Sequence, residues 1–175
     1  MKKTILASLL TISVVMGGCG NKTVEDKAKV TVSSGEISKG IKVGEELAPY
    51  TFKDQFDVEH SLTNKVKKVI FVFTKPTGHL MRVFLGQKEI DYLDKRDIDF
   101  IADVSGMPSV IYKMFALPDL KNSKYPILII KEKENALRFR NEEQKNAVMI
   151  ISLKNKIVQN VKFVTNEKDL ASELD

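Results

Sequence analysis

The residues that could do chemistry are few, and they lie far apart in the sequence. Cys19 is the only cysteine among 175 residues, and the two histidines are His60 and His79. Met81 follows His79 closely, and a thioether sulfur beside an imidazole could suit copper(I). A metal site usually requires three or four convergent ligands, and only His60 and Asp103 could be added. Metal binding through His79 and Met81 is therefore the alternative, and a polar residue at a helix start is the simpler interpretation of His79.

Asp103 and Ser105 form a second polar pair, at the end of a predicted strand. Open α/β sheets bind ligands at the carboxyl ends of their strands, so both side chains could line a cleft. Aspartate and serine are also frequent N-caps of helices, and we favour capping of the helix that follows. The fragment "KPTG" lacks the glycine spacing of a phosphate loop. Because no Ser/His/Asp signature or paired-carboxylate motif is present either, we expect no enzyme activity; an enzyme with unrecognised chemistry is the third alternative.

Cys19 directly follows a secretory signal pattern. The lysines of "MKK" precede the apolar run "TILASLLTISVVM", which is shorter than the roughly 20 apolar residues that span a bilayer. Residues 16–19, "MGGC", resemble the lipobox of bacterial lipoproteins, with methionine in place of the usual aliphatic residue. The resemblance implies a signal peptide at 1–18, cleavage before Cys19, and two or three acyl chains on this cysteine, palmitate among them. The alternative is a secreted protein with a stray cysteine.

The lipobox resemblance also implies where the protein is located. Two or more acyl chains anchor a protein stably in a membrane, and the anchored chain would lie outside the cytoplasm. In a double-membraned bacterium, Gly20 in place of aspartate after Cys19 implies the outer membrane, on its periplasmic side. The formal net charge of +5 is spread along the chain, which favours a solvated surface over nucleic-acid binding. We therefore expect the membrane and an envelope protein or peptide as partners, with no nucleic acid and no cofactor.

The chain after Cys19 divides into a polar segment and a folded domain. Residues 19–43 are polar and punctuated by glycine, and this composition predicts a flexible tether. Ordered patterns begin at Gly44, so the predicted domain covers 44–175. Its first stretch, "GEELAPYTFKDQFDVEHSLTN", predicts a β-hairpin.

Strand and helix patterns then alternate to the end of the chain. Strands are predicted at 67–74, 97–104, 125–130, 147–153 and 157–164, helices over 79–94, after Ser105 and over 166–174, and a charged loop over 131–146. The helix after Ser105 should end before Pro118. Its apolar stripe consists of Val110, Ile111, Met114 and Phe115, and we interpret this stripe as a core face. The order predicts an α/β sheet covered by helices, parallel at first and antiparallel at its end.

The domain resembles the thioredoxin-like superfamily, in particular its peroxiredoxin-like and cytochrome-maturation-like branches. The matching lead-in residues are Gly44, Ala48, Pro49, Phe52, Asp54, Ser61 and Leu62, with Asp57 where the family has glycine. The resemblance implies a mixed sheet with flanking helices and an N-terminal β-hairpin. The family's proline before its third strand is held cis and faces the active site. Pro126 in "KYPILII" matches that proline, so we expect a cis Tyr125–Pro126 bond close to Gly78 and His79.

The departure from the family concerns its reactive cysteine. That cysteine lies between the strand "VIFVFT" and the next helix, where this chain has "KPTGHLM". Redox chemistry there requires a thiolate at a helix N-terminus and a second thiol to resolve the intermediate. We therefore expect a lipid-anchored extracytoplasmic protein that acts as a non-redox binding or accessory module of the cell envelope. Gly78, His79 and Pro126 are its candidate ligand-binding residues, and copper handling is the alternative function.

Overall fold

A computed structural model describes residues 36–38 and 41–175. The predicted signal peptide, Cys19 and most of the predicted tether lie outside the described residues. Among the described residues, no helix combines the length and the apolar character needed to cross a membrane. Inside the predicted tether, β1 (Glu36–Ser38) and β2 (Ile41–Lys42) pair antiparallel. Ile41 is fully buried, so the folded unit begins before Gly44.

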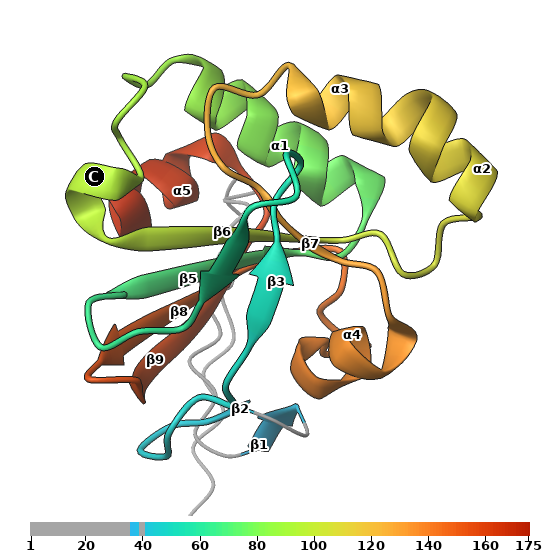
Figure 1. The fold of residues 1–175 in the computed structure, drawn as a ribbon. Helices are drawn as coiled ribbons and strands as arrows, with labels where there is room; N and C mark the ends of the chain where they lie inside the picture. The colour runs from blue at the N-terminus through green and yellow to red at the C-terminus, as the bar shows by residue number, and fades with distance from the viewer. Residues whose placement is uncertain (1–35, 39–40) are drawn as a thin grey trace, which may run out of the picture.

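Seven strands form one mixed sheet in the order β4-β3-β7-β6-β5-β8-β9 (Figure 1). These strands are β3 (Thr51–Lys53), β4 (Glu59–Ser61), β5 (Lys68–Val72), β6 (Ile98–Asp103), β7 (Leu128–Ile130), β8 (Val148–Lys154) and β9 (Ile157–Val164). β5, β6 and β7 run parallel, whereas β8 and β9 form an antiparallel ending. The predicted α/β fold with its N-terminal hairpin is confirmed.

Helices cover both faces of the sheet (Figure 1). The helices are α1 (Lys75–Gly86), α2 (Ser109–Ile111), α3 (Leu117–Lys121), α4 (Lys133–Phe139) and α5 (Glu167–Leu174). Side chains of β5 alternate between the faces, as a strand covered on both sides requires. Val69 and Phe71 pack in the core beneath α4, and Ile70 and Val72 pack beneath α1 and α5. The buried apolar residues run from Ile41 to Leu174, so a chain that begins at residue 20 keeps this entire core.

The first helix begins earlier and ends earlier than predicted. Thr74 is its N-cap and Pro76 lies in its first turn, where proline is well tolerated. The helix ends at Gly86. Ile90 lies within the predicted helix 79–94 but is 69% exposed beyond the observed helix end. The predicted range therefore combines a real helix with the turn that follows it.

The charged segment 131–146 is not only a loop, because it contains α4. Ala136 and Phe139 are fully buried, and they face the sheet one helical turn apart. The Phe139 ring lies 5.0 Å from that of Phe71, 6.2 Å from that of Tyr50 and 6.3 Å from that of Phe52, measured between centroids. Two buried apolar positions in a charged helix give too weak a periodic signal to be read from sequence.

The helix after Ser105 also differs from the prediction. α2, a π-helical turn (η2, Tyr112–Ala116) and α3 form one helical run that passes through Pro118. The Leu117 amide donates to the Tyr112 carbonyl, five residues back, and this wider turn precedes a proline that lacks an amide of its own. The apolar stripe of this run is not a core face. Val110 is 61% exposed, Met114 64% and Phe115 63%.

Two turns depend on residues in the left-handed region. Asn155 and Lys156 have φ values of 50° and 66°, as the two-residue turn between β8 and β9 requires. Asp57, which replaces the glycine of the family pattern, has φ 63°. Its position keeps the backbone conformation for which glycine is the usual choice.

Candidate functional site

The N-terminus of α1 carries two threonines at the spacing of a C-x-x-C motif. In proteins with that motif, two thiols stand at a helix start. Thr74 is the N-cap and Thr77 lies three residues later. Their hydroxyl oxygens are 3.2 Å apart. Thr77 Oγ1 donates to the Thr74 carbonyl at 2.8 Å and accepts from the Thr74 amide at 3.2 Å. Sequence reasoning missed this pair because it began the helix at His79.

The three candidate residues on α1 point into different surroundings. Gly78 lies in the first turn, and its amide donates to the Thr74 carbonyl at 3.0 Å. His79 is exposed, whereas Met81 is fully buried in the core. Residues two apart on a helix project in nearly opposite directions, so His79 and Met81 do not converge on one ion. Within the described ranges, no group of three or more His, Cys, Asp or Glu residues could hold a metal ion.

The predicted cis bond before Pro126 is wrong, because the described residues contain no cis peptide bond. The buried Gln55 side chain spans this proline instead. Its Nε2 donates to the Tyr125 carbonyl, and its Oε1 accepts from the Ile127 amide, both at 2.8 Å. The Tyr125 hydroxyl also donates to the Leu85 carbonyl, near the end of α1, at 3.2 Å.

Pro126 does not lie beside Gly78 and His79. It precedes β7, which runs parallel to β6 and β5, and α1 starts after the opposite end of β5. Pro126 is therefore at the amino end of the parallel strands, while Gly78 and His79 are at their carboxyl end. These three residues do not form one site.

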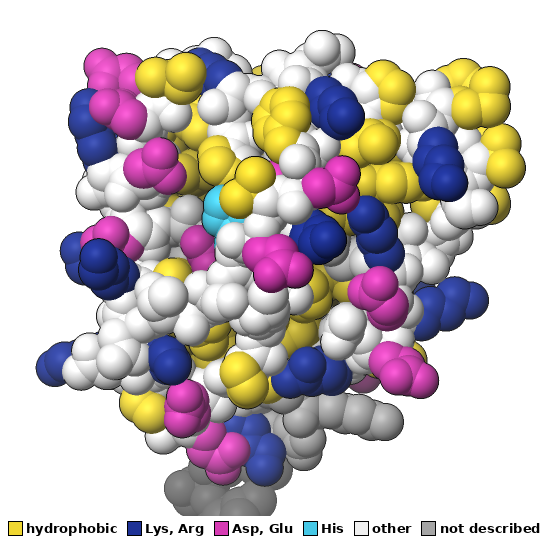
Figure 2. Space-filling view, viewed as in Figure 1, with side chains coloured by type: hydrophobic (Ala, Val, Ile, Leu, Met, Phe, Trp, Pro, Cys, Tyr) yellow, Lys and Arg dark blue, Asp and Glu magenta, His cyan; other side chains and the backbone are white. Residues whose placement is uncertain are grey.

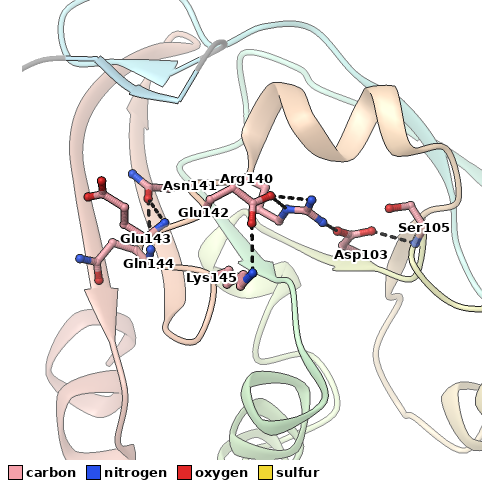
Figure 3. Close-up of polar contacts among 8 residues, drawn as sticks. All are labelled: Asp103, Ser105, Arg140, Asn141, Glu142, Glu143, Gln144 and Lys145. Carbon is pink, nitrogen blue, oxygen red and sulfur yellow. Dashed lines mark hydrogen bonds and ion pairs between the residues drawn. The ribbon is translucent and has the colours of Figure 1, made fainter.

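A polar cluster lies at the carboxyl ends of the parallel strands, and Figure 3 shows its members. We call Asp103, Ser105, Arg140, Glu142 and Lys145 the carboxyl-edge cluster. Asp103, at the end of β6, accepts from the Ser105 amide at 2.8 Å and from Arg140 Nη1 at 3.2 Å. Arg140 Nε also donates to Glu142 at 2.7 Å, and Lys145 contacts the other Glu142 oxygen at 3.2 Å. The charges thus alternate along the cluster.

Burial decreases along this cluster from the sheet toward solvent. The Asp103 side chain is 3% exposed, that of Arg140 24% and that of Glu142 53%. Hydrogen bonds from Lys145 and Arg140 lower the pKa of Glu142. The Ser105 Oγ atom is buried, and none of the described atoms bonds to it. Because Asp103 already accepts two bonds and none of the described basic groups bonds to Ser105 Oγ, the arrangement suits positioning and binding better than proton transfer.

The favoured interpretation of Asp103 and Ser105 as helix caps is wrong. The N-cap of α2 is Pro108, and no side chain caps this helix. Asp103 instead holds the chain after α4 through Arg140, a residue that the sequence analysis assigned to a loop. Arginine pairs with carboxylates across long sequence separations, so only the fold reveals this partner.

Replacing Arg140 by alanine should lower the free energy of unfolding by about 1–3 kcal/mol, because a buried Asp103 carboxylate would lose its charged partner. Asp103→Asn still accepts the Ser105 amide and should cost less. Added to Arg140→Ala, it should recover part of the loss. Urea unfolding of the single and double variants measures this coupling. Strictly additive effects would contradict a direct Asp103–Arg140 interaction.

Comparison with known proteins gives a fold but no close relative. No family model matches the chain, and neither does any curated protein. A conserved protein of unknown function from Bacteroides fragilis aligns over 77% of this chain and 100% of its own, with a TM-score of 0.53 and 10% identity. A proposed protein disulfide isomerase from Bacteroides thetaiotaomicron aligns over 78% and 89%, with a TM-score of 0.51 and 18% identity. A peroxiredoxin-like protein from Aquifex aeolicus aligns over 83% and 90%, with a TM-score of 0.50 and 12% identity. The fold is thioredoxin-like.

The thioredoxin-like topology explains the error at Pro126. The match of Pro126 to the family's proline makes residues 125–130 the third strand of the family's core. The strand that lies antiparallel beside β5 and opens the final hairpin is β8, whereas β7 pairs with β6 and β3. Asn146 and Ala147 precede β8. The family's proline position in the thioredoxin-like core thus contains no proline in this chain.

Two further polar pairs lie around the β3–β4 hairpin. The Tyr50 hydroxyl donates to Asp99 at 2.5 Å, and burial raises the pKa of Asp99. Asp99 also lines a shallow recess of about 190 Å³ at the amino end of β6. Burial alone would raise the pKa of Asp54, but hydrogen bonds from His60 and from the Phe56 and Val58 amides lower it. His60 Nε2 lies 3.0 Å from Asp54, so His60 braces the hairpin.

Proposed function

We propose that this protein is a lipid-anchored, extracytoplasmic thioredoxin-like protein that acts as a non-redox binding or accessory module of the cell envelope. The observation that carries the non-redox part is the Thr74–Thr77 pair, which takes the two positions of a thiol motif at the start of α1. Disulfide exchange requires a thiolate nucleophile. A threonine hydroxyl provides no thiolate and forms no disulfide.

The anchoring part of the proposal is supported by the sequence around Cys19. A signal pattern ends in "MGGC", and an acylated Cys19 would make the membrane the first partner. The carboxyl-edge cluster supports the binding part. Its outer members, Glu142 and Lys145, are about half exposed and offer both charges to an envelope protein or peptide. Copper handling gains no support from His79 and Met81, because their side chains lie apart.

A chain of residues 20–175 should neither reduce insulin nor consume peroxide with a thiol donor, since it contains no cysteine. The matched control is the double variant Thr74→Cys/Thr77→Cys. Its thiols would stand at a helix N-terminus, where the helix dipole lowers the thiol pKa, and we expect measurable insulin reduction. Thiol-dependent turnover by the unmodified chain above a no-protein blank would sink the non-redox assignment.

A further inference from the structure

The helical run Ser109–Lys121 presents an apolar surface that the core does not use. We call its exposed apolar side chains, with one from the preceding turn, the helical patch: Met107, Val110, Ile111, Met114 and Phe115. Figure 2 shows hydrophobic side chains gathered where Figure 1 draws α2, with Lys or Arg side chains beside them. A contiguous exposed apolar surface marks an interaction site in a soluble domain.

Lysines outnumber carboxylates around the helical patch, where burial and the nearby Asp57 carboxylate raise the pKa of Tyr112. Lys113 and Lys121 lie on the same run, and no ion pair of the described residues includes either lysine. Asp119 is the only carboxylate of the run, and Arg82 neutralises it through two hydrogen bonds. Lys131 Nζ lies 5.5 Å from the centre of the Tyr112 ring. An anionic partner therefore fits this surface.

We propose that the helical patch docks the domain onto an anionic lipid surface. Val110, Met114 and Phe115 would enter the boundary between headgroups and acyl chains, and Lys113 and Lys121 would meet lipid phosphates. Apolar helix faces flanked by lysine bind membranes in this way, and each lysine near an anionic surface adds to the attraction. The choice of a lipid surface rests on the proposed anchoring at Cys19, which would hold the domain beside a bilayer.

The shape and charge of the helical patch favour lipid over the other occupants. A protein partner that buries a helix usually offers a groove shaped to it, whereas a bilayer adapts to any convex apolar surface. A symmetric second copy would gather the Lys113 and Lys121 side chains of both copies around one interface, and like charges repel.

Vesicle binding tests this proposal without the anchor. The chain of residues 20–175 has no acylation site and is mixed with vesicles of phosphatidylcholine, with or without phosphatidylglycerol. We expect sedimentation with the anionic vesicles, at least tenfold weaker binding to neutral ones, and loss of binding at high salt. Absence of binding to anionic vesicles overturns the docking proposal. Palmitate labelling of the complete chain tests the anchoring separately, so the two failures are distinguishable.

Variants locate the contact on the helical patch. Met114→Ser/Phe115→Ser should weaken vesicle binding more than tenfold, because it removes the apolar area that would enter the lipid. Lys113→Glu should weaken it at least about fivefold. Ile90→Ser, at an exposed apolar position outside the patch, should bind as the unmodified chain does. Equal binding by all variants, or a dimer in sedimentation that Met114→Ser/Phe115→Ser abolishes, would overturn the lipid assignment.

Discussion

Replacing Cys19 by serine should abolish incorporation of labelled palmitate and leave the precursor uncleaved. Serine offers no thiol for the diacylglycerol thioether, and the resemblance to lipoproteins implies that the signal peptidase requires the lipidated cysteine. The measurement is metabolic labelling of cells that express the complete chain, followed by gel separation of precursor and mature forms. The expected effect is complete loss of the label, the largest change that we predict.

The matched control for Cys19→Ser is Thr23→Ser, which leaves "MGGC" intact. It should label and mature like the unmodified chain. Persistent label in Cys19→Ser would show that acylation occurs elsewhere. It would also overturn the assignment of Cys19 as the anchor. Processing of Cys19→Ser to the mature length would instead indicate an ordinary secreted protein.

Replacing Phe139 by alanine should lower the free energy of unfolding by about 3–5 kcal/mol. Phe139 is fully buried, and its ring lies against three others from β3, β5 and the segment before β3. Alanine would leave a cavity between α4 and the sheet, because residues on both sides of the ring are held by strand pairing. Urea unfolding of the chain of residues 20–175 measures the loss.

Leu137→Ala is the control on the same helix. Leu137 is 47% exposed, and this substitution should change the free energy of unfolding by no more than about 0.5 kcal/mol. Equal losses for the two variants would contradict the packing of α4 against the sheet. A large loss for both would indicate that helix formation itself, and not the buried ring, stabilises this part of the domain.

Sequence reasoning worked where the signal was local. The strand at 157–164 and the helix at the end of the chain were predicted from neighbouring residues alone, and the Asn166 side chain caps this helix by accepting from the Asp169 amide at 2.9 Å. Alternation and continuous apolar runs are properties of single segments. The order of elements was sufficient to suggest the thioredoxin-like sheet, which the solved structures then supported.

The site could not be predicted because its contacts join distant segments. The pairing of Asp103 with Arg140 and the span of Gln55 across Pro126 depend on which strands are neighbours. Because β7 comes before β8 in the chain, Pro126 precedes β7 and not β8, the strand that corresponds to the family's third strand. No local sequence pattern distinguishes these two strands. The stripe from Val110 to Phe115 has the spacing of a core face. Periodicity shows that such a face exists but does not reveal what covers it.

The two edges of the sheet affect how such chains behave when many share one surface. Unpaired edge strands are templates for pairing between molecules, and anchoring to a membrane would crowd chains side by side. The edge strand β4 has only three residues. At the other edge, the Gly44 and Leu47 amides donate to the carbonyls of Val158 and Lys156 at 2.8 and 2.9 Å, so backbone bonds already occupy the start of β9. The short β4 and the covered start of β9 thus shorten the edges that neighbouring copies could pair with.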